Sequence, residues 1–412
     1  MPAAESGSPA LDAARHLFDR AHLSSPGDMP AALAEAARML GWTARMFLVD
    51  DEQRVLIPVG AHGEQVGAHL SIDGTLAGRA FRLVEPVHAR SAQPALWVPL
   101  LDGVHRFGVV LFGFPAGTDL DAPHVRDAYR MLADATGHLV AAKAPYGDAF
   151  RRVTRLRERA VASELLWDLL PPLTFGCEDL VLSAILAPTY DVAADAFDYS
   201  VLDGVAHLAV LDATGHALPG TVLVAVTLAA MRKSRRESRS LYDTVQAMDE
   251  IVALQGRREA FVTGVVAELD LTTGRLRYIN AGHPAPLLMR AGKVVKHLEG
   301  GRRILLGLGE GIASVAEEWL EPGDRVVFYT DGVTEARSAD NEQFGVPRLV
   351  DQLERSTAGG LPAPETLRLV ARDVLEHQHG VLQDDATLLV AEWATGEERG
   401  YTPDPGHGPY GT

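Results

Sequence analysis

Residues 324–337 read DRVVFYTDGVTEAR. The β-branched and aromatic residues at 326–329 predict a buried strand, and the chain passes directly from it into Thr330, Asp331 and Gly332. A carboxylate in this position lies near the edge of a buried layer. Burying its charge there costs free energy unless the carboxylate is hydrogen-bonded, paired or bound to a cation. If other strands deliver aspartates to the same edge, the stretch marks a site as well as a turn.

Aspartates do recur at strand boundaries in the second half of the chain. YDVAADAFDYSVLDG contains Asp195 and Asp198, HLAVLDATGHAL carries a strand into Asp212, and LQDDATLLVAEW places Asp384 and Asp385 before a final strand. A single Asp-Gly after a strand is more often a turn or helix-cap residue, so the prediction depends on the combination. Oxygen ligands without nearby His or Cys pairs favour Mg²⁺ or Mn²⁺ over zinc. Two such ions can activate a water and clamp a phosphoryl oxygen, so the pattern predicts a metal-dependent phosphatase.

The segment from about 160 to 394 resembles the SpoIIE-like branch of the protein phosphatase 2C-type (PPM) family in the order and spacing of its motifs. The matching stretches are YDVAADAFDY, LDATGHA, FVTGVVAELDLTTGRLRYINAGHPAPLL, LEPGDRVVFYTDGVTEAR, FGVPRL and DDATLLV. The resemblance implies an αββα sandwich, a binuclear Mn²⁺ or Mg²⁺ centre, and hydrolysis of phosphoserine or phosphothreonine. Members of this branch typically act on a phosphorylated anti-anti-sigma factor and release a sigma factor by partner switching, so a phosphoprotein of that kind is the expected substrate.

The same resemblance assigns roles to individual residues. Asp212 corresponds to the bridging metal ligand, with the backbone carbonyl of Ala213 beside it, and Asp331 and Asp384 correspond to further ligands. Asp195 matches the acid of the first motif, which supports the centre directly or through water. The predicted catalytic residues are therefore Asp195, Asp212, Asp331 and Asp384, and the predicted metal site consists of Asp195, Asp212, Ala213, Asp331, Asp384 and Asp385. Asp198 accompanies the first motif without an assigned role.

Two motifs depart from the family pattern. The family usually carries Gly-Gly-Asp and Ser-Gly-His-Gly, whereas this chain has Ala193-Ala194-Asp195 and Thr214-Gly215-His216-Ala217. An alanine forced into a positive-φ conformation costs about 1–2 kcal/mol and can displace the neighbouring carboxylate. Two hypotheses therefore stay open: an active serine/threonine phosphatase, and a catalytically impaired regulator with the same fold that binds a partner or ligand without turnover.

Residues 1–145 predict a separate α+β unit. A helical pattern at 28–42 is followed by extended runs, by a hairpin with its turn at Asp102 and Gly103, and by a second helix at 122–143. The pattern resembles a GAF domain, chiefly through SIDGTLAGRAFR and LWVPLLDGVHRFGVVLF. The resemblance implies a sensor or dimerisation module that binds an unknown small ligand or only mediates contacts.

The remaining boundaries follow from composition. Residues 146–172 predict a linker helix, because apolar positions recur at helical spacing over 148–170 and two prolines then end the pattern. The phosphatase-like domain is expected over 173–396, and residues 397–412 read as a disordered tail. We expect a homodimer, with the N-terminal unit controlling activity through the linker helix or through dimerisation.

Composition limits the other possibilities. The formal charge of −17 argues against nucleic-acid binding. The single Cys177 excludes a disulfide framework within the chain, and no apolar stretch reaches the ~20 residues that span a bilayer. No GxxxxGK[ST] motif supports an ATPase. A cytoplasmic protein with no membrane association is the resulting expectation.

Three further groups have ordinary explanations. His216 and His283 are candidates for proton transfer, but a histidine bonded to a loop is the more frequent case, so neither is predicted as catalytic. The basic run MRKSRRESR at 231–239 is typical of a solvated helix end. A less favoured interpretation is that it docks an acidic phosphoprotein.

Overall fold

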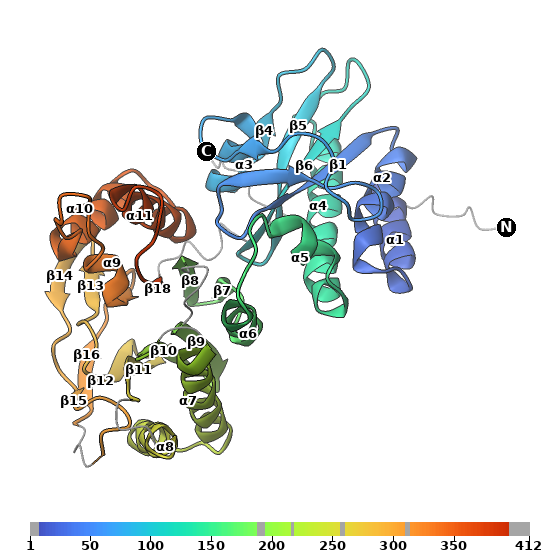
Figure 1. Cartoon of the computed structure of the whole chain (residues 1–412). Helices are drawn as coiled ribbons and strands as arrows, with labels where there is room; N and C mark the ends of the chain where they lie inside the picture. Colours follow the sequence, from blue (N-terminus) through green and yellow to red (C-terminus); the bar gives the residue numbers. More distant parts are fainter. Residues whose placement is uncertain (1–7, 188–193, 216–217, 256–259, 310–313, 395–412) are drawn as a thin grey trace. The chain divides into compact units, whose positions relative to one another are not determined.

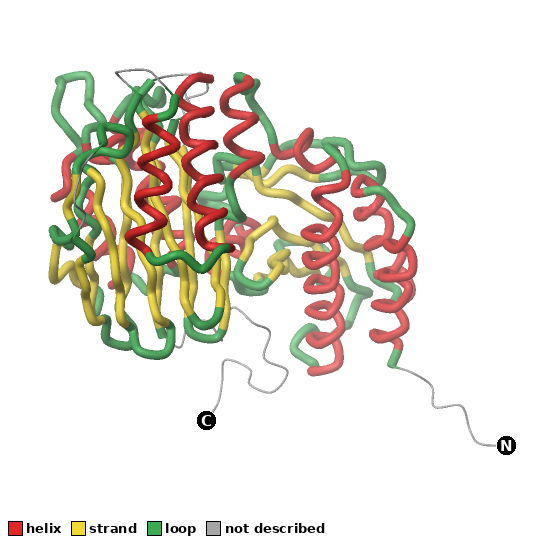
Figure 2. Tube along the Cα trace, turned by 90° about the horizontal axis from the view of Figure 1, so that it is seen from below, coloured by secondary structure: helices red, strands yellow, loops and turns green. Residues whose placement is uncertain are grey.

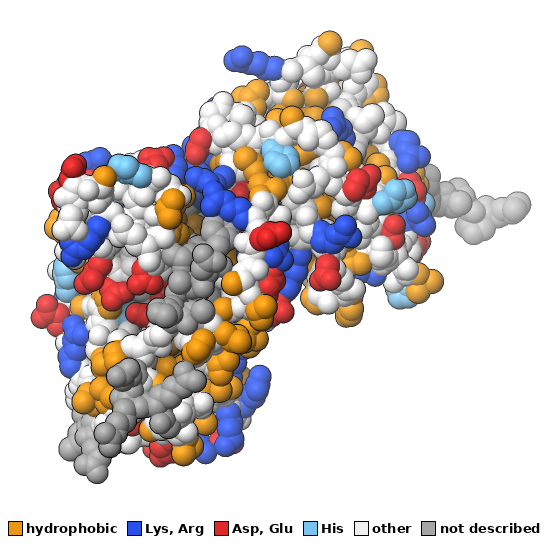
Figure 3. Space-filling view, viewed as in Figure 1, with side chains coloured by type: hydrophobic (Ala, Val, Ile, Leu, Met, Phe, Trp, Pro, Cys, Tyr) orange, Lys and Arg blue, Asp and Glu red, His pale blue; other side chains and the backbone are white. Residues whose placement is uncertain are grey.

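The computed structural model describes residues 8–187, 194–215, 218–255, 260–309 and 314–394. The chain separates into two compact units, with the boundary between Arg157 and Glu158 (Figure 1). Among the described helices, none is both long enough and apolar enough to cross a membrane. Figure 3 shows acidic and basic side chains intermixed over the visible face of each unit.

The N-terminal unit is built on a six-stranded antiparallel sheet in the order β3-β2-β1-β6-β5-β4. Its strands are β1 (Thr43–Val49), β2 (Val55–Pro58), β3 (Leu70–Ser71), β4 (Val87–His88), β5 (Ala95–Asp102) and β6 (His105–Gly113). β5 and β6 form the predicted hairpin, in which Asp102 pairs with His105 and Gly103 adopts a positive φ. The mixed helix and sheet architecture predicted for this unit is confirmed.

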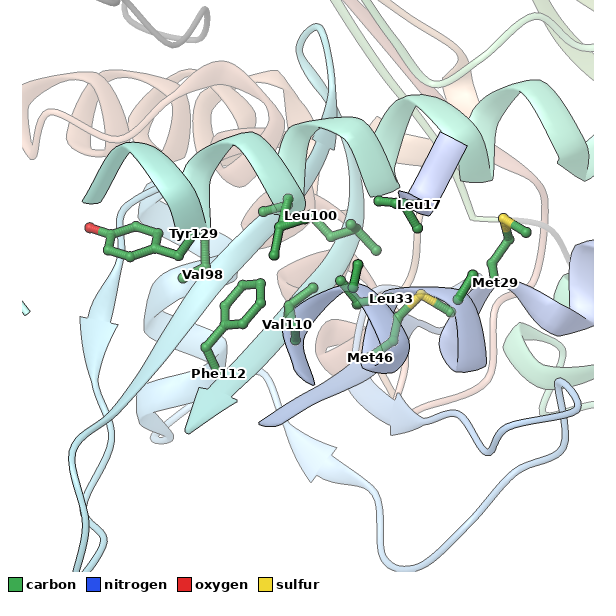
Figure 4. Packing of buried hydrophobic residues seen from close by; sticks show 14 of the residues in the cluster. Leu17, Met29, Leu33, Met46, Val98, Leu100, Val110, Phe112 and Tyr129 are labelled. Carbon is green, nitrogen blue, oxygen red and sulfur yellow. The ribbon is translucent and has the colours of Figure 1, made fainter. Parts of the chain in front are cut away.

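Helices cover both faces of the N-terminal sheet. The helices are α1 (Pro9–His22), α2 (Met29–Met39), α3 (Leu76–Leu83) and α4 (Pro123–Lys143), with the short turns η1 (Pro26–Asp28) and η2 (Ala144–Tyr146). α1, α2 and α4 share one core with the sheet, and α3 packs on a second cluster that includes Phe81. In Figure 4, Leu33, Met46, Val110 and Phe112 interdigitate between α2 and the strands. The sequence prediction contained α2 and α4 but not α1 or α3.

The predicted continuous linker helix is wrong. The structure has two short helices, α5 (Ala149–Thr154) and α6 (Val161–Leu169), and Arg155 between them has an extended backbone. Phe150 and Val153 of α5 are buried in the core of the N-terminal unit, whereas Ala162 and Leu166 of α6 are buried in the C-terminal unit. Apolar residues recur at helical spacing in both helices, but those of α5 and those of α6 enter different cores.

The C-terminal unit contains two antiparallel-rich sheets of six strands each (Figure 2). The first sheet has the order β15-β12-β11-β10-β9, with β16 paired to β12, and the second has the order β14-β13-β17-β18-β8-β7. The first sheet consists of β9 (Asp195–Leu202), β10 (Val205–Ala213), β11 (Val262–Asp270), β12 (Arg275–Ala281), β15 (Arg302–Arg303) and β16 (Ala316–Trp319). The second consists of β7 (Thr174–Cys177), β8 (Leu180–Ala187), β13 (Leu287–Arg290), β14 (Lys293–His297), β17 (Arg325–Tyr329) and β18 (Ala386–Trp393).

Helices lie on the outer face of each sheet. α7 (Leu218–Arg236) and α8 (Leu241–Ala253) share a core with α6 and the first sheet, while α9 (Asp331–Thr334), α10 (Gly345–Ala358) and α11 (Ala363–His377) share one with the second sheet. A third core between the sheets contains Phe197, Leu208 and Leu389. β18 is buried at every position, as expected for a strand with both faces covered. These layers confirm the αββα sandwich.

Candidate active site

The first sheet brings two of the predicted acids face to face. Asp195 begins β9, Asp212 lies near the end of β10, and the two residues are directly opposite each other in the antiparallel register. Like charges in this position destabilise a strand pair. The arrangement therefore places two mutually repelling carboxylates at one end of the sheet.

The second sheet contributes three more acids. Asp331 follows the end of β17 as the first residue of α9, and Asp384 and Asp385 immediately precede β18. Because β17 and β18 are antiparallel, the end of one and the start of the other lie at the same edge. The charges of Asp331, Asp384 and Asp385 add to burial in raising the pKa of Asp212, so acids of the second sheet lie within electrostatic range of the first.

The five acids differ in exposure. Asp195 and Asp385 are buried, Asp212 and Asp331 are half-buried, and Asp384 is exposed. We call Asp195 and Asp385 the inner acids, and Asp212, Asp331 and Asp384 the outer acids. Only the outer acids reach solvent.

The environment disfavours ionisation of these groups. Burial, reinforced by Asp331, Asp384 and Asp385, raises the pKa of Asp212 to about 8. Burial also raises the pKa of Asp331, with Asp384 and Glu335 adding to the effect. A divalent cation among the outer acids would offset this repulsion and restore the charged forms.

The inner acids are hydrogen-bonded across the two sheets. The Thr330 hydroxyl donates to Asp195 Oδ2 at 2.6 Å and accepts from the Thr387 amide at 3.0 Å. The Ala194 amide donates to Asp385 Oδ2 at 2.9 Å. Sequence reasoning did not assign a role to Thr330 or Thr387, although both lie beside predicted site residues.

The donor set has the chemistry of a hard-cation site, because carboxylate oxygens are the ligands that Mg²⁺ and Mn²⁺ prefer. As the side chains stand, no group of three His, Cys, Asp or Glu residues within the described ranges is gathered closely enough to hold a metal ion. The charges of the acids nevertheless act on one another. Their roles as metal ligands stay a prediction.

Glycine permits a close approach within the site. A Cβ on Gly332 would lie 1.9 Å from the backbone oxygen of Asp385, so only glycine fits where α9 begins beside β18. Gly215 adopts a φ of +94° after Asp212. Glycine is therefore required at 332 by the close packing and favoured at 215 by the positive φ.

The alanine in the first motif is not strained. Ala194 does not belong to the residues with positive φ, and its methyl group lies over Gly220, where a Cβ would be 3.1 Å away. The strain expected at this position is absent. Ala193, His216 and Ala217 lie outside the described residues.

Asp198 serves a different purpose from Asp195. Its buried carboxylate accepts from Arg232 at 2.6 Å and from Arg235 at 3.0 Å, and Arg232 also donates to the Leu169 carbonyl. These contacts join β9, α7 and the end of α6. Two cations of the basic run are therefore committed to an internal ion pair, which weakens the docking interpretation of that run.

His283 lies where the chain crosses from the first sheet to the second, between β12 and β13. Its imidazole is 2% exposed and its Nδ1 lies 2.8 Å from the Thr263 hydroxyl, while the Asn280 side chain bonds the His283 backbone. Burial lowers the pKa of His283 to about 3. These contacts support the structural role expected for it.

The family model of stage II sporulation protein E (SpoIIE) matches residues 203–394. These residues form a SpoIIE-type domain. The match includes β10, β17 and β18, which carry or adjoin Asp212, Asp331 and Asp384.

Relatives of known name match different shares of the chain. Protein IcfG of Synechocystis sp. (strain ATCC 27184 / PCC 6803 / Kazusa) is 30% identical over 142 residues, which are 34% of this chain and 22% of that protein. Phosphoserine phosphatase RsbU of Bacillus subtilis (strain 168) is 22% identical over 282 residues, which are 65% of this chain and 82% of RsbU. The solved RsbU and RsbW domains of Rv1364c from Mycobacterium tuberculosis are 26% identical, with a TM-score of 0.46, over 53% of this chain and 62% of theirs.

The ion pair of Asp198 gives a prediction about the stability of the SpoIIE-type domain. Asp198→Ala leaves Arg232 and Arg235 without their buried partner, so the free energy of unfolding should fall by about 3 kcal/mol. Glu237→Ala is the control, because Glu237 pairs only at the surface with Lys233 and Arg239, and it should cost about 0–1 kcal/mol. Urea unfolding followed by circular dichroism measures both, and equal losses would contradict the role assigned to Asp198.

The buried His283 makes stability depend on pH. Above pH about 6.5, the imidazole is neutral in both the folded and the unfolded chain. Below that pH the unfolded chain binds a proton that the folded domain excludes until about pH 3, so stability falls by up to about 1.4 kcal/mol per pH unit. His283→Asn should remove this component between pH 6.5 and 5, whereas His297→Asn on the exposed strand β14 should not. Parallel pH profiles of the melting temperature for wild type and His283→Asn would refute the prediction.

Proposed function

We propose that this chain is a metal-dependent serine/threonine phosphoprotein phosphatase. The proposal is carried by Asp212 at the end of β10, where burial and, after it, the charges of Asp331, Asp384 and Asp385 from the second sheet raise its pKa to about 8. The match of residues 203–394 to the SpoIIE family supports the same activity.

The outer acids would hold one or two Mn²⁺ or Mg²⁺ ions, with the Ala213 carbonyl beside Asp212. The bound ions supply Lewis acidity and a water of lowered pKa. The chain's own residues fix the carboxylates at the two sheet ends, and Gly332 lets the start of α9, which carries Asp331, lie against the backbone of Asp385. Asp195 supports the centre from the buried side.

The proposed substrate is a phosphorylated anti-anti-sigma-like protein in a partner-switching pathway. The relative named phosphoserine phosphatase RsbU, of which 82% is covered, supports hydrolysis of phosphoserine, and the anti-anti-sigma-like partner follows from the motif resemblance. A cytoplasmic location is part of the proposal and fits the reducing environment expected from the single Cys177.

A second candidate is a regulator that binds a partner without turnover. It is favoured by the absence, within the described part of the chain, of a group of three acids close enough to hold a metal. The unstrained backbone of Ala194 weighs against it. Measurements of metal binding and of turnover on one sample separate the two candidates.

Substitution of the outer acids tests the proposed activity. Asp212→Asn and Asp331→Asn should each lower manganese-dependent hydrolysis of a small aryl phosphate by on the order of 10²-fold or more, as expected when a reacting group is misplaced. EDTA should abolish the activity, and added Mn²⁺ should restore it. Asp203→Asn is the matched control, because Asp203 lies in the exposed turn between β9 and β10. Mn²⁺ binding without turnover in wild type would favour the regulator, and unchanged turnover in both variants would refute the assigned site.

The N-terminal unit is proposed to be a GAF-like sensor that controls the phosphatase, within a homodimer. A cavity of about 280 Å³ supports ligand binding; it lies beside α3, β5 and β6 and is lined mainly by apolar side chains, including Leu76, Trp97 and Leu111. Arg90 at its wall has no ion pair with any residue in the described ranges and would suit an acidic group. A small apolar anion is therefore the proposed ligand class.

Filling the cavity tests this proposal. Leu111→Trp should weaken binding of the apolar anion anilinonaphthalene sulfonate by on the order of ten-fold, because the larger side chain occupies the ligand's volume. Leu23→Trp is the control, since Leu23 is 92% exposed on the surface of the same unit. Equal fluorescence titrations for wild type and Leu111→Trp would argue against a ligand in this cavity.

A further inference from the structure

The inner acids occupy a different chemical environment from the outer ones. Asp195 opens β9 of the first sheet, Asp385 lies before β18 of the second sheet, and both are buried. Each accepts a hydrogen bond from the opposite sheet: Asp195 from Thr330, and Asp385 from the Ala194 amide. The two bonds run in opposite directions between the two sheets, one from the end of β17 to β9 and the other from the residue before β9 to the residue before β18.

We propose that Thr330 and Asp385 are positioning residues that hold Asp195 behind the outer acids, and that Asp385 acts through its hydrogen bond to Ala194 and not as a metal ligand. This inference rests on the proposed phosphatase function and replaces the ligand role that the motif comparison gives to Asp385. We call these contacts, Thr330 with Asp195 and Thr387 and Asp385 with Ala194, the cross-sheet clamp.

The geometry of Asp385 supports this role. Its Oδ2 is 2.9 Å from the Ala194 nitrogen, and the side chain is 2% exposed. Neighbouring Asp384 is exposed instead. Two consecutive acids before one strand therefore differ in accessibility, and the outer one is available to a cation.

Thr330 occupies the centre of the clamp. Its hydroxyl donates to Asp195 and accepts from the Thr387 amide, and its own amide donates to the Thr387 carbonyl at 3.1 Å. The side chain is fully buried, so an apolar replacement of the same shape would take a hydrogen bond from both the Asp195 carboxylate and the Thr387 amide. Asp331 follows Thr330 in the chain, and so the clamp also fixes the point from which that outer acid projects.

Paired substitutions separate positioning from ligation. Asn at 385 keeps an oxygen that accepts the Ala194 hydrogen bond but removes the charge, whereas Ala at 385 removes both. Asp385→Asn should therefore bind Mn²⁺ like wild type, and Asp385→Ala should bind it about 10- to 100-fold more weakly, as is typical for residues that orient metal ligands. Asp384→Asn, the matched change at the adjacent outer acid, should lose binding.

Position 330 provides an independent pair. Thr330→Ser keeps the hydroxyl and should retain Mn²⁺ affinity, whereas Thr330→Val keeps the shape and should lose about 10- to 100-fold. Isothermal titration of Mn²⁺ into the full-length chain measures affinity, and hydrogen exchange of the β9 segment without metal measures the clamp itself. Protection of that segment should fall in Asp385→Ala and Thr330→Val but not in Asp385→Asn and Thr330→Ser.

The two readouts distinguish failure of the clamp from failure of the proposed function. Loss of Mn²⁺ binding in Asp385→Asn as complete as in Asp384→Asn would make Asp385 a ligand and overturn the inference. Unchanged affinity and protection in Thr330→Val would overturn it as well. If the wild-type protein does not bind Mn²⁺, the proposed function fails. The cross-sheet clamp is then tested by hydrogen exchange alone, and equal protection of the β9 segment in all four variants would overturn it.

Discussion

Repulsion between carboxylates at the ends of two packed sheets is the constraint on which this site depends. Antiparallel pairing sets Asp195 directly opposite Asp212, and the second sheet adds three more acids to the same edge. The fold accommodates this in two ways: it supplies buried hydrogen-bond donors to the inner acids, and it leaves the outer acids in contact with water. The core between the sheets, which includes Phe197 and Leu389, packs the two sheets against each other, so the site also depends on this core.

Much of this organisation was predictable, because strand ends and turns are local features. The apolar run before Asp331 predicts the end of one strand, and the paired acids at 384 and 385 indicate the start of the last strand. The motif resemblance then supplied what local patterns lack, namely that these boundaries meet. The αββα layers and the N-terminal hairpin followed from the same combination.

The remaining features depend on partners far along the chain. Asp195 and Asp198 belong to one short motif, and only Arg232 and Arg235, 34 and 37 residues away from Asp198, determine that the latter is an internal ion-pair acceptor. Thr330 is separated from Asp195 by 135 residues, so no spacing rule reveals its hydroxyl as a donor. The predicted linker helix differs from the structure for a related reason. Periodicity predicts a helix, but it does not indicate that Phe150 and Leu166 enter different cores.

The division between inner and outer acids has a consequence for ion selectivity. Selectivity between divalent cations depends on how rigidly a cavity imposes ligand distances, since Mg²⁺ requires ligands at about 2.0–2.1 Å in near-ideal octahedral geometry. Here the buried carboxylates accept hydrogen bonds across the two sheets, whereas the solvent-facing ones are half-buried or exposed, and the Asp384 carboxylate accepts a hydrogen bond from the amide of the next residue. In the proposed phosphatase, ligands that are held this unevenly would adjust to the radius of the bound ion. The choice between manganese and magnesium would then follow their concentrations in the cell more than the shape of the protein.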